Sequence, residues 1–257
     1  MILAIDVGNT NIVLGCLEDG EIRSVVRMQT APRETEIEHA IKLRQILEFC
    51  GIDPLSFEGA ILSSVVPPLT GPLTAAVKRV TGRDCLVVGP GMKTGMNVRL
   101  DDPTSLAGDL VVGSVGAMAC YGVPAIVLDM GTATTMVLID KDGCYRGGAI
   151  LPGVKLSYSA LAAGTSLLPD ISITAPKKVI ATNTVDSKRS GAVFGSAATI
   201  DGMIDRMEEE IGYPCAVVAT GGIARAVTPY CRRKVICDDD LLLKGLWVLW
   251  LKNKRQA

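Results

Sequence analysis

Two segments of the chain combine a carboxylate, a glycine and a run of small polar side chains. One reads Asp-Val-Gly-Asn-Thr-Asn over residues 6–11, and the other reads Asp-Met-Gly-Thr-Ala-Thr over residues 129–134. The N–H and hydroxyl groups of such a turn can hold anionic oxygens, while the carboxylate holds a hydrated cation. Each segment could equally be a hairpin turn in which Asn and Thr serve the backbone geometry. Two facing turns of this kind predict a site for the phosphate chain of a nucleoside triphosphate.

A glycine pair, Gly221-Gly222, follows an apolar run that ends at Thr220. The backbone of this turn could lie against a flat base or a ribose. The pair is a weak signal by itself and gains weight from the two polar segments. The chain has no Gly-x-x-x-x-Gly-Lys-Ser/Thr motif and no Gly-x-Gly-x-x-Gly after a strand, so P-loop and Rossmann nucleotide sites are not predicted.

Phosphoryl transfer also needs a group that orients and deprotonates an acceptor hydroxyl, and a carboxylate is the usual choice. Asp109 is the candidate because it follows Gly108 directly before a long uncharged segment and has no basic neighbour in sequence. The same residue could equally be an aspartate favoured by the dipole at the beginning of a helix.

The chain contains an internal repeat that predicts how these residues are positioned. The offset of 123 residues that aligns Asp6 with Asp129 also aligns Asp19-Gly20 with Asp142-Gly143. Each copy is an apolar strand, a polar turn, a second apolar strand, an Asp-Gly turn and a third strand. Further patterns predict helices over 34–50, 69–80, 155–164, 191–211 and 240–252, and strands over 59–66, 85–88 and 215–220.

The predicted fold class is therefore α/β, with a mixed sheet flanked by helices occurring twice. The length of 257 residues fits one large or two small domains. We expect a boundary near residue 115. Residues 1–115 would carry the first phosphate loop, and residues 116–257 would carry the second loop and the glycine turn.

Composition excludes several classes of function. The 26 Lys and Arg balance 27 Asp and Glu without forming a block, so nucleic acid is not an expected partner. The uncharged stretch over residues 110–128 is broken by Gly122-Val123-Pro124 and is not expected to span a membrane. The first residues have no basic region and are predicted as a strand, so we expect no signal peptide and a cytoplasmic protein.

Cysteine and histidine are not expected to carry the chemistry. The eight cysteines include no Cys-x-x-Cys pair and are interpreted as small hydrophobic residues in a reducing compartment. The single histidine, His39, is expected at an exposed position of a helix. Ser-His-Asp, Cys-His and multi-histidine metal sites therefore have few residues from which to be built.

These residues together resemble the type III pantothenate kinase family. The motifs that carry the resemblance occur in order over essentially the whole chain: Asp6-Val-Gly-Asn-Thr-Asn11, Ser63-Ser-Val-Val-Pro67, Asp109, Asp129-x-Gly-Thr-Ala-Thr134, Gly147-Gly-Ala-Ile-x-Pro-Gly153, Leu168-Pro169, Thr220-Gly-Gly222 and Leu243-x-Gly-Leu246. The resemblance implies two ribonuclease H-like domains around a central cleft, as in the actin, Hsp70 and sugar kinase superfamily. It also implies ATP-dependent phosphorylation of the primary hydroxyl of pantothenate, the first step toward coenzyme A.

The resemblance further implies the roles of individual residues. The ATP contacts would be Asp6, Val7, Gly8, Asn9, Thr10, Asn11, Ile12, Val13, Thr132, Thr134, Gly221 and Gly222. Asp6 would hold Mg²⁺ through water, and Asp129 would bind a monovalent cation, K⁺ or NH₄⁺. Asp109 would be the proton acceptor.

On the acceptor side, the resemblance implies contacts from Ala107, Gly108, Leu110 and Thr184. Thr184 matches a substrate-binding threonine that the family contributes across a homodimer interface, although it could equally be an ordinary residue near a helix N-cap.

Two positions depart from the family pattern, both on the acceptor side. Leu110 stands where the family usually has an arginine, and Leu100 stands where it usually has a tyrosine. Loss of an arginine contact to a carboxylate corresponds to roughly 1.5–3 kcal/mol, or about tenfold to a hundredfold in affinity. The alternatives are a family member with a different acceptor, such as another small-molecule kinase, and a non-catalytic nucleotide-binding regulator.

Overall fold

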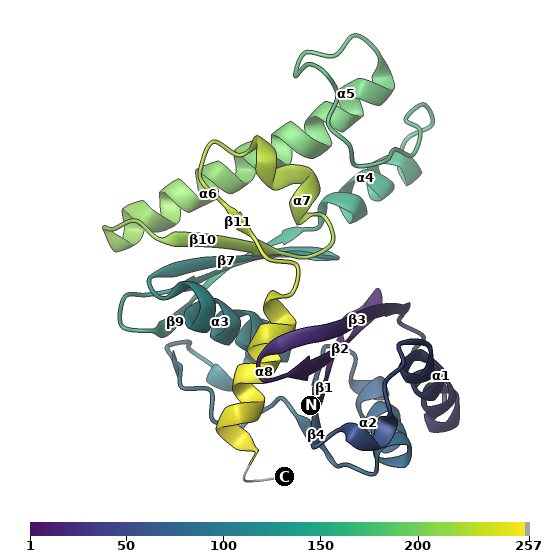
Figure 1. Ribbon diagram of the computed structural model, residues 1–257. Coiled ribbons are helices and arrows are strands. Elements are labelled where there is room, and N and C mark those ends of the chain that lie inside the picture. The colour runs from purple at the N-terminus through teal and green to yellow at the C-terminus, as the bar shows by residue number, and fades with distance from the viewer. Residues whose placement is uncertain (255–257) are drawn as a thin grey trace. The chain divides into compact units, whose positions relative to one another are not determined.

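The computed structural model describes residues 1–254 and contains two compact units. Unit 1 consists of residues 1–95, 102–119 and the chain from Leu241 onward, and unit 2 consists of residues 96–101 and 120–240. Each unit is built on one mixed β-sheet with helices packed against it (Figure 1). The predicted fold class, in which the same α/β arrangement occurs twice, is confirmed.

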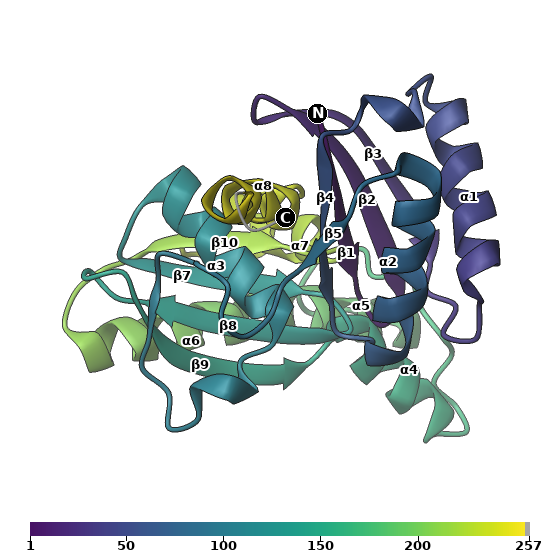
Figure 2. The ribbon, with the colours of Figure 1, turned by 90° about the horizontal axis from the view of Figure 1, so that it is seen from below.

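The sheet of unit 1 has the strand order β3-β2-β1-β4-β5. Strands β1 to β3 form an antiparallel meander, and β4 and β5 continue the sheet in parallel with β1. Helices α1 and α2 lie on one face of this sheet, and α3 and α8 lie on the other (Figure 2). The elements are β1 (Ile2–Val7), β2 (Asn11–Glu18), β3 (Glu21–Gln29), α1 (Glu36–Phe49), β4 (Gly59–Ser64), α2 (Pro67–Thr81), β5 (Cys85–Val87), α3 (Gly108–Tyr121, of which the last two residues belong to unit 2) and α8 (Leu241–Asn253).

The sheet of unit 2 repeats this order as β9-β8-β7-β10-β11, with one more strand, β6, beside β9. Its elements are β6 (Asn97–Val98), β7 (Ala125–Met130), β8 (Ala133–Ile139), β9 (Cys144–Pro152), α4 (Val154–Ala163), α5 (Thr184–Ser190), α6 (Ser196–Ile211), β10 (Ala216–Thr220), α7 (Ala224–Val227) and β11 (Ile236–Cys237). A π-helical segment joins α5 to α6, so the helical region begins seven residues before the predicted residue 191. The shared strand order supports the internal repeat.

This division differs from the expected one in three places. The expected boundary at residue 115 lies inside α3, residues 96–101 belong to unit 2, and α8 belongs to unit 1 rather than to the second half of the chain. The physical reason is packing: apolar side chains of α8 such as Leu246 and Trp250 are buried with Ile2 of β1 and Val112 of α3. A division drawn from the repeat alone could not show this return of the chain.

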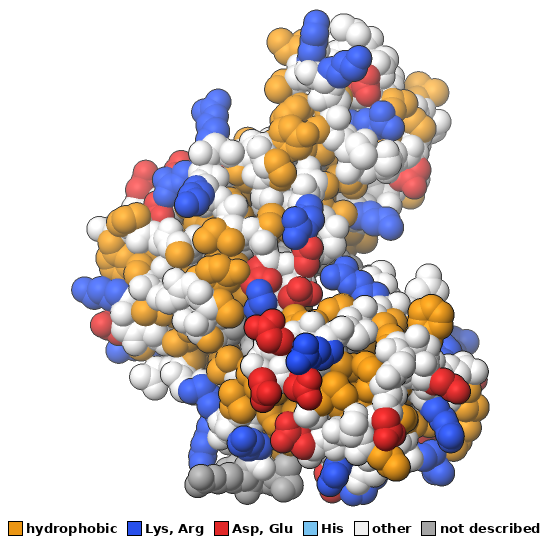
Figure 3. Space-filling model, in the orientation of Figure 1, with side chains coloured by type: hydrophobic (Ala, Val, Ile, Leu, Met, Phe, Trp, Pro, Cys, Tyr) orange, Lys and Arg blue, Asp and Glu red, His pale blue; other side chains and the backbone are white. Residues whose placement is uncertain are grey.

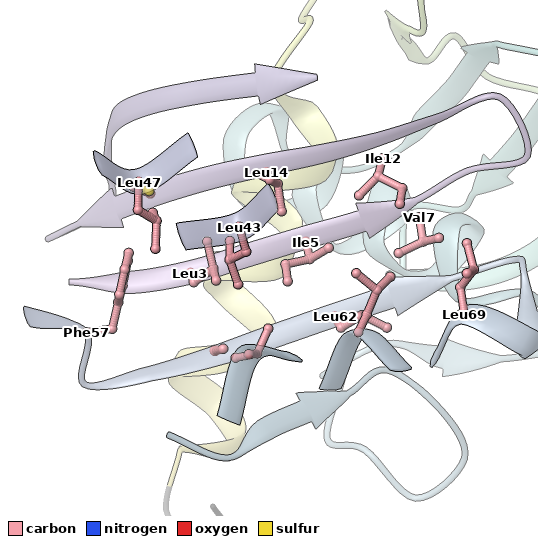
Figure 4. Close-up of a cluster of buried hydrophobic side chains, with 14 of the residues drawn as sticks. Leu3, Ile5, Val7, Ile12, Leu14, Leu43, Leu47, Phe57, Leu62 and Leu69 are labelled. Atoms are coloured by element: carbon pink, nitrogen blue, oxygen red, sulfur yellow. The ribbon is translucent and has the colours of Figure 1, made fainter. Parts of the chain in front are cut away.

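The two faces of β1 belong to different apolar clusters. Leu3, Ile5 and Val7 point into the cluster formed with α1 and α2 (Figure 4), whereas Ile2 and Ala4 pack toward α3 and α8. Both faces are therefore buried, as expected for a central strand. Because side chains alternate along a strand, the next residue on the α3 side is Asp6.

The uncharged segment over residues 110–128 forms most of α3 and the first part of β7. Helix α3 is rich in small residues because it crosses α8 closely. A Cβ on Gly116 would lie 2.6 Å from the carbonyl oxygen of Leu241, and a Cβ on Gly245 would collide with the carbonyl of Val112. None of the helices in the described part of the chain is long and apolar enough to cross a membrane.

The expectation of an exposed His39 is wrong. Its side chain is 1% exposed, because α1 turns His39, Leu43 and Leu47 toward the core. Burial lowers the pKa of His39, and its Nδ1 lies 3.6 Å from a carboxylate oxygen of Glu34. The eight cysteines are free thiols, although only Cys16 and Cys144 are fully buried.

Candidate active site

The first polar loop connects β1 to β2 and is held at both ends by hydrogen bonds. The N–H of Gly8 donates to the carbonyl oxygen of Asn11 at 2.9 Å. The hydroxyl of Thr30 donates to the carbonyl of Gly8 at 2.6 Å, and the N–H of Thr30 donates to the carbonyl of Thr10 at 3.0 Å. The side chains of Asn9, Thr10 and Asn11 are exposed. The loop therefore presents amide and hydroxyl groups on a fixed backbone.

Three of the expected ATP contacts have apolar side chains that lie within the sheet. Val7 and Ile12 are buried in the core shared with α1 and α2, and Val13 packs against the cluster on the other face. Because their side chains pack in these clusters, these residues can contact a ligand only through backbone groups.

Asp6 lies beside residues that bring α3 to the same edge of the sheet. In the parallel pairing of β1 with β4, Asp6 is opposite Ser63, and both are buried. A Cβ on Gly108 would lie 3.3 Å from the Ser63 hydroxyl oxygen. The missing side chain of Gly108 therefore lets the beginning of α3 approach Ser63, and Asp109 follows immediately. The structure therefore brings the beginning of α3, which carries Asp109, to the end of the β-sheet that carries Asp6.

Asp109 is the second residue of α3 and is half-buried. One of its carboxylate oxygens accepts a hydrogen bond from the N–H of Leu110 at 2.8 Å. Burial raises the pKa of Asp109 above its usual value, and this hydrogen bond opposes the shift only partly. A carboxylate with a raised pKa is a stronger base than an exposed one, as general-base chemistry favours.

The second polar loop connects β7 to β8 in unit 2. Asp129 of β7 pairs with Thr220 of the parallel strand β10, and the glycine turn follows. Gly221 has φ of +93°, and a Cβ there would lie 2.6 Å from Asp129 Oδ1 and from backbone atoms of Met130. The N–H of Ile223 donates to the carbonyl of Met130 at 3.3 Å. Only glycine at position 221 allows this close contact, which brings the glycine turn to the Asp129 carboxylate.

The remaining part of this loop is hydrogen-bonded to the residue that follows β9. The N–H of Gly153 donates to the carbonyl of Thr132 at 3.1 Å, and a Cβ on Gly153 would collide with that oxygen. Thr132 is exposed, and so is Gly222, whereas Thr134 is buried in the sheet. Thr132 and Gly222 can therefore reach a ligand directly.

The expected acceptor contacts lie in different units. Ala107 is exposed and Leu110 is half-buried at the beginning of α3 in unit 1. Thr184 lies in unit 2, where it lines an open groove next to α4. Leu100 also belongs to unit 2, and its side chain contacts the position of Gly147 on β9.

Sequence reasoning assigned no role to Ser63 or Gly153. The hydroxyl of Ser63 is buried and has no hydrogen-bond partner among the described residues. The alternation of β4, in which Ile61 packs toward α3, is the signal that would have placed Ser63 on the same face as Asp6. Gly153 belongs to the motif over residues 147–153, but its role depends on contact with a loop 21 residues earlier, which the motif does not show.

The donor set around Asp6 suits a hydrated magnesium ion. Within residues 1–254, no group of three or more His, Cys, Asp or Glu side chains could hold a metal ion. Mg²⁺ commonly keeps several waters and takes only one or two carboxylates together with substrate phosphates. One carboxylate beside the unpartnered Ser63 hydroxyl fits this kind of site.

Comparison with known proteins identifies the family. The model of the type III pantothenate kinase family matches residues 2–206 of the chain. A type III pantothenate kinase of Halalkalibacterium halodurans is 40% identical over 253 residues, which cover 98% of this chain and 100% of that protein.

Solved structures of other proteins share the fold. Component A of the (R)-2-hydroxyglutaryl-CoA dehydratase of Acidaminococcus fermentans has a TM-score of 0.58 at 15% identity, with coverage of 100% of this chain and 99% of that one. The ROK hexokinase of Thermus thermophilus has a TM-score of 0.50 at 15% identity, with coverage of 98% and 99%. Both likenesses concern the fold alone, in which two mixed α/β sheets occur in one chain.

Proposed function

Because this chain belongs to the type III pantothenate kinase family, we propose that it transfers the γ-phosphoryl group of ATP to the primary hydroxyl of pantothenate, the first step of coenzyme A biosynthesis. The observation that carries the proposal is the repeated site architecture. In each unit the central strand presents an aspartate, Asp6 or Asp129, directly before an exposed polar loop that backbone hydrogen bonds fix in place.

The first loop binds the phosphates of ATP. Asn9, Thr10 and Asn11 supply exposed amide and hydroxyl groups, and Gly8 lets the backbone approach the phosphate oxygens. Val7, Ile12 and Val13 support the loop and contribute backbone groups only. Asp6 holds Mg²⁺ through water, and the ion neutralises charge on the phosphates when it is bound.

In unit 2, the second loop and the glycine turn also contact the nucleotide. Thr132 contacts ATP through its exposed hydroxyl, and Gly221 with Gly222 lies against the adenosine. Asp129 binds the monovalent cation, K⁺ or NH₄⁺. The close packing of Gly221 on Asp129 Oδ1 supports this assignment because it fixes the carboxylate next to the turn.

Asp109 accepts the proton of the pantothenate hydroxyl as the phosphoryl group is transferred. Two observations support this role: its pKa is raised, and it follows Gly108, which approaches Ser63 opposite Asp6. Ala107 and Gly108 present backbone to the acceptor. Leu110 offers no charge to the pantothenate carboxylate, so that charge must be met by another residue.

We further propose a homodimer in which Thr184 of one copy contacts the acceptor of its partner. Exposed apolar side chains are concentrated on unit 2 between residues 150 and 185, where Leu167 is 88% exposed and Ile180 is 85% exposed. Figure 3 shows hydrophobic side chains at the surface around α4 and α5. An apolar surface of this kind is typical of a protein–protein interface.

Mixed dimers test the exchange of Thr184. We expect Thr184→Ala and Asp109→Asn to be impaired separately. If Thr184 acts across the interface, a mixed dimer contains one site with both substitutions and one with neither. After dissociation and reassociation at equal amounts, activity should return to about a quarter of that of the unsubstituted protein. Failure of the mixture to recover activity would contradict the exchange.

The reaction is tested by measuring ADP release from ATP in the presence of Mg²⁺ and K⁺. Pantothenate should stimulate the release, and Asp109→Asn should lose roughly a hundredfold to ten-thousandfold of turnover while ATP still binds. Tight ATP binding without stimulation by pantothenate would contradict the proposed function.

We propose a cytoplasmic location for this reaction. Its support is the cysteine chemistry, because none of the eight cysteines forms a disulfide bond. Cysteines without disulfide bonds are typical of proteins in a reducing compartment.

A further inference from the structure

Unit 2 contains an open groove of about 600 Å³ between α4 and the beginning of α5. Figures 1 and 2 both show these two helices side by side. One side of the groove is apolar, with Tyr158, Leu161 and Leu168, and the other side carries hydroxyl and amide groups, including those of Asn183 and Thr184. No acidic side chain is among its lining residues in the described chain.

Lys188 is the charged residue that lines this groove. Its side chain is 6% exposed, and Nζ donates one hydrogen bond, at 2.6 Å, to the carbonyl oxygen of Pro169. An ammonium group has three donors. Within residues 1–254, no carboxylate forms an ion pair with Lys188, whereas its neighbour Arg189 is paired with Asp186.

A buried charge without a counter-charge is unusual. Burial of an isolated ammonium group is costly, and buried charges in proteins are normally paired or bind a ligand of opposite charge. The remaining donors of Lys188 lie in a groove rather than in a closed core. The cavity therefore has the charge, donors and access that a small carboxylate requires.

We propose that Lys188 binds the carboxylate of the acceptor. The proposal rests on the function proposed above and names the residue that meets the charge left unmatched by Leu110. Lys188 lies four residues after Thr184, so the two side chains project from the same face of α5. Lys188 therefore serves whichever acceptor site Thr184 serves.

The amphipathic lining fits such a ligand. Hydroxyl and amide groups beside Lys188 can bind the oxygens of a carboxylate and an amide, while Tyr158 and Leu161 can cover a short carbon chain. A carboxylate side chain from a second copy of the protein has the same charge. The experiment below distinguishes these two sources.

The charge is tested with Lys188→Met, which keeps the length of the side chain and removes the ammonium group. We expect KM for pantothenate to rise about tenfold to a hundredfold, with KM for ATP unchanged, because one charge-assisted contact is lost. Lys188→Arg should retain most of the affinity. Lys178→Met is the matched control, because Lys178 is exposed and does not line the groove.

A neutral acceptor tests the charge in the unsubstituted protein, so the result does not depend on whether a variant folds. Pantothenyl alcohol has a hydroxymethyl group in place of the carboxylate, so the unsubstituted protein should use it with a KM about tenfold to a hundredfold higher than that of pantothenate. Lys188→Met should use both compounds with similar KM. An equal loss for both compounds, or no loss for pantothenate, would overturn the proposal.

Two further measurements separate the alternatives. If Lys188 instead pairs with a carboxylate of a second copy, Lys188→Met weakens the dimer in sedimentation experiments without changing the preference for pantothenate, and the proposal is refuted. If the unsubstituted protein shows no turnover at all, the proposed function fails. Calorimetric binding of pantothenate to the unsubstituted protein and to Lys188→Met then still decides whether Lys188 binds the carboxylate.

Discussion

The contact between Gly221 and Asp129 gives the sharpest test of how the second loop is built. Replacement of Gly221 by alanine places a Cβ 2.6 Å from Asp129 Oδ1 and 2.6 Å from two backbone atoms of Met130. Neither backbone atom can rotate away, as the end of a flexible side chain could. The φ of +93° adds a second cost, because an L-residue with a side chain rarely adopts this conformation.

The magnitude follows from these two costs. Left-handed backbone costs a non-glycine residue about 1–2 kcal/mol, and overpacking of a tight site costs about 1–3 kcal/mol. Together they predict that Gly221→Ala lowers the free energy of unfolding by about 2–5 kcal/mol. In a chain of this size, that change lowers Tm by roughly 5–20 °C.

The function should change with the stability, because the displaced oxygen belongs to the carboxylate proposed to hold the monovalent cation. We expect the K⁺ concentration for half-maximal activation to rise about tenfold to a hundredfold. The assay is ADP release as a function of K⁺ concentration, run beside thermal denaturation. Rubidium or ammonium ions, which also act as monovalent cations, should show a shift in the same direction.

Gly222→Ala is the matched control. No atom lies within 4 Å of a Cβ at this position, and its φ is not in the left-handed region. We expect its stability to change by less than about 0.5 kcal/mol. If Gly221→Ala and Gly222→Ala change the stability alike, the contact with Asp129 does not organise the turn.

The other predictions concern charge and packing. The gain in Tm from Asp109→Asn should be absent at pH 3 and should grow as pH rises, because the raised pKa of the buried carboxyl means that its ionisation opposes folding; the activity of the unsubstituted protein should fall as pH drops through that pKa. His39→Leu should abolish part of the loss of Tm below pH 6.5, because the lowered pKa of His39 makes its protonation favour the unfolded chain. Gly59→Ala should destabilise the protein by about 1–3 kcal/mol, because its Cβ would collide with the ring of Trp250. Gly71→Ala, in open space on α2, should be neutral or stabilising by up to about 1 kcal/mol. Chemical denaturation measures both changes.

The regular elements could be predicted because their signals are local. Alternating apolar residues and Asp-Gly turns predicted both meanders. Four of the five predicted helices lie within two residues of their observed bounds, whereas the helical region predicted from residue 191 begins at Thr184. The position of Asp109 near the Asp6 edge is different, since it depends on the close approach of Gly108 to Ser63. A contact between residues 45 positions apart leaves no trace in local periodicity.

His39 shows that one missed feature did have a local signal. The charged neighbour Glu38 suggested an exposed position, but His39, Leu43 and Leu47 are spaced four residues apart and therefore share one face of α1. That face packs against α2 and the sheet. Spacing was the better guide than the identity of adjacent residues.

The two phosphate loops differ in length, although the sequence repeat suggests a constant offset of 123 residues. The first strands and the third strands of the two units are 123 residues apart at both ends, but β2 begins at Asn11 and β8 begins at Ala133, which is 122 residues later. Val7 pairs with Ile12, whereas Met130 pairs with Thr134, so the second phosphate loop is one residue shorter.

The next turn is one residue longer in unit 2 and restores the offset. Asp19-Gly20 in unit 1 corresponds to residues 141–143 in unit 2. Both meanders also keep a register shift at the equivalent point, between Cys16 and Leu17 and between Leu138 and Ile139. If β8 followed the offset of 123 residues, every one of its side chains would point to the opposite face of the sheet. With the offset of 122 residues, Thr134 takes the buried position of Ile12. The two aspartates precede the change and keep equivalent places.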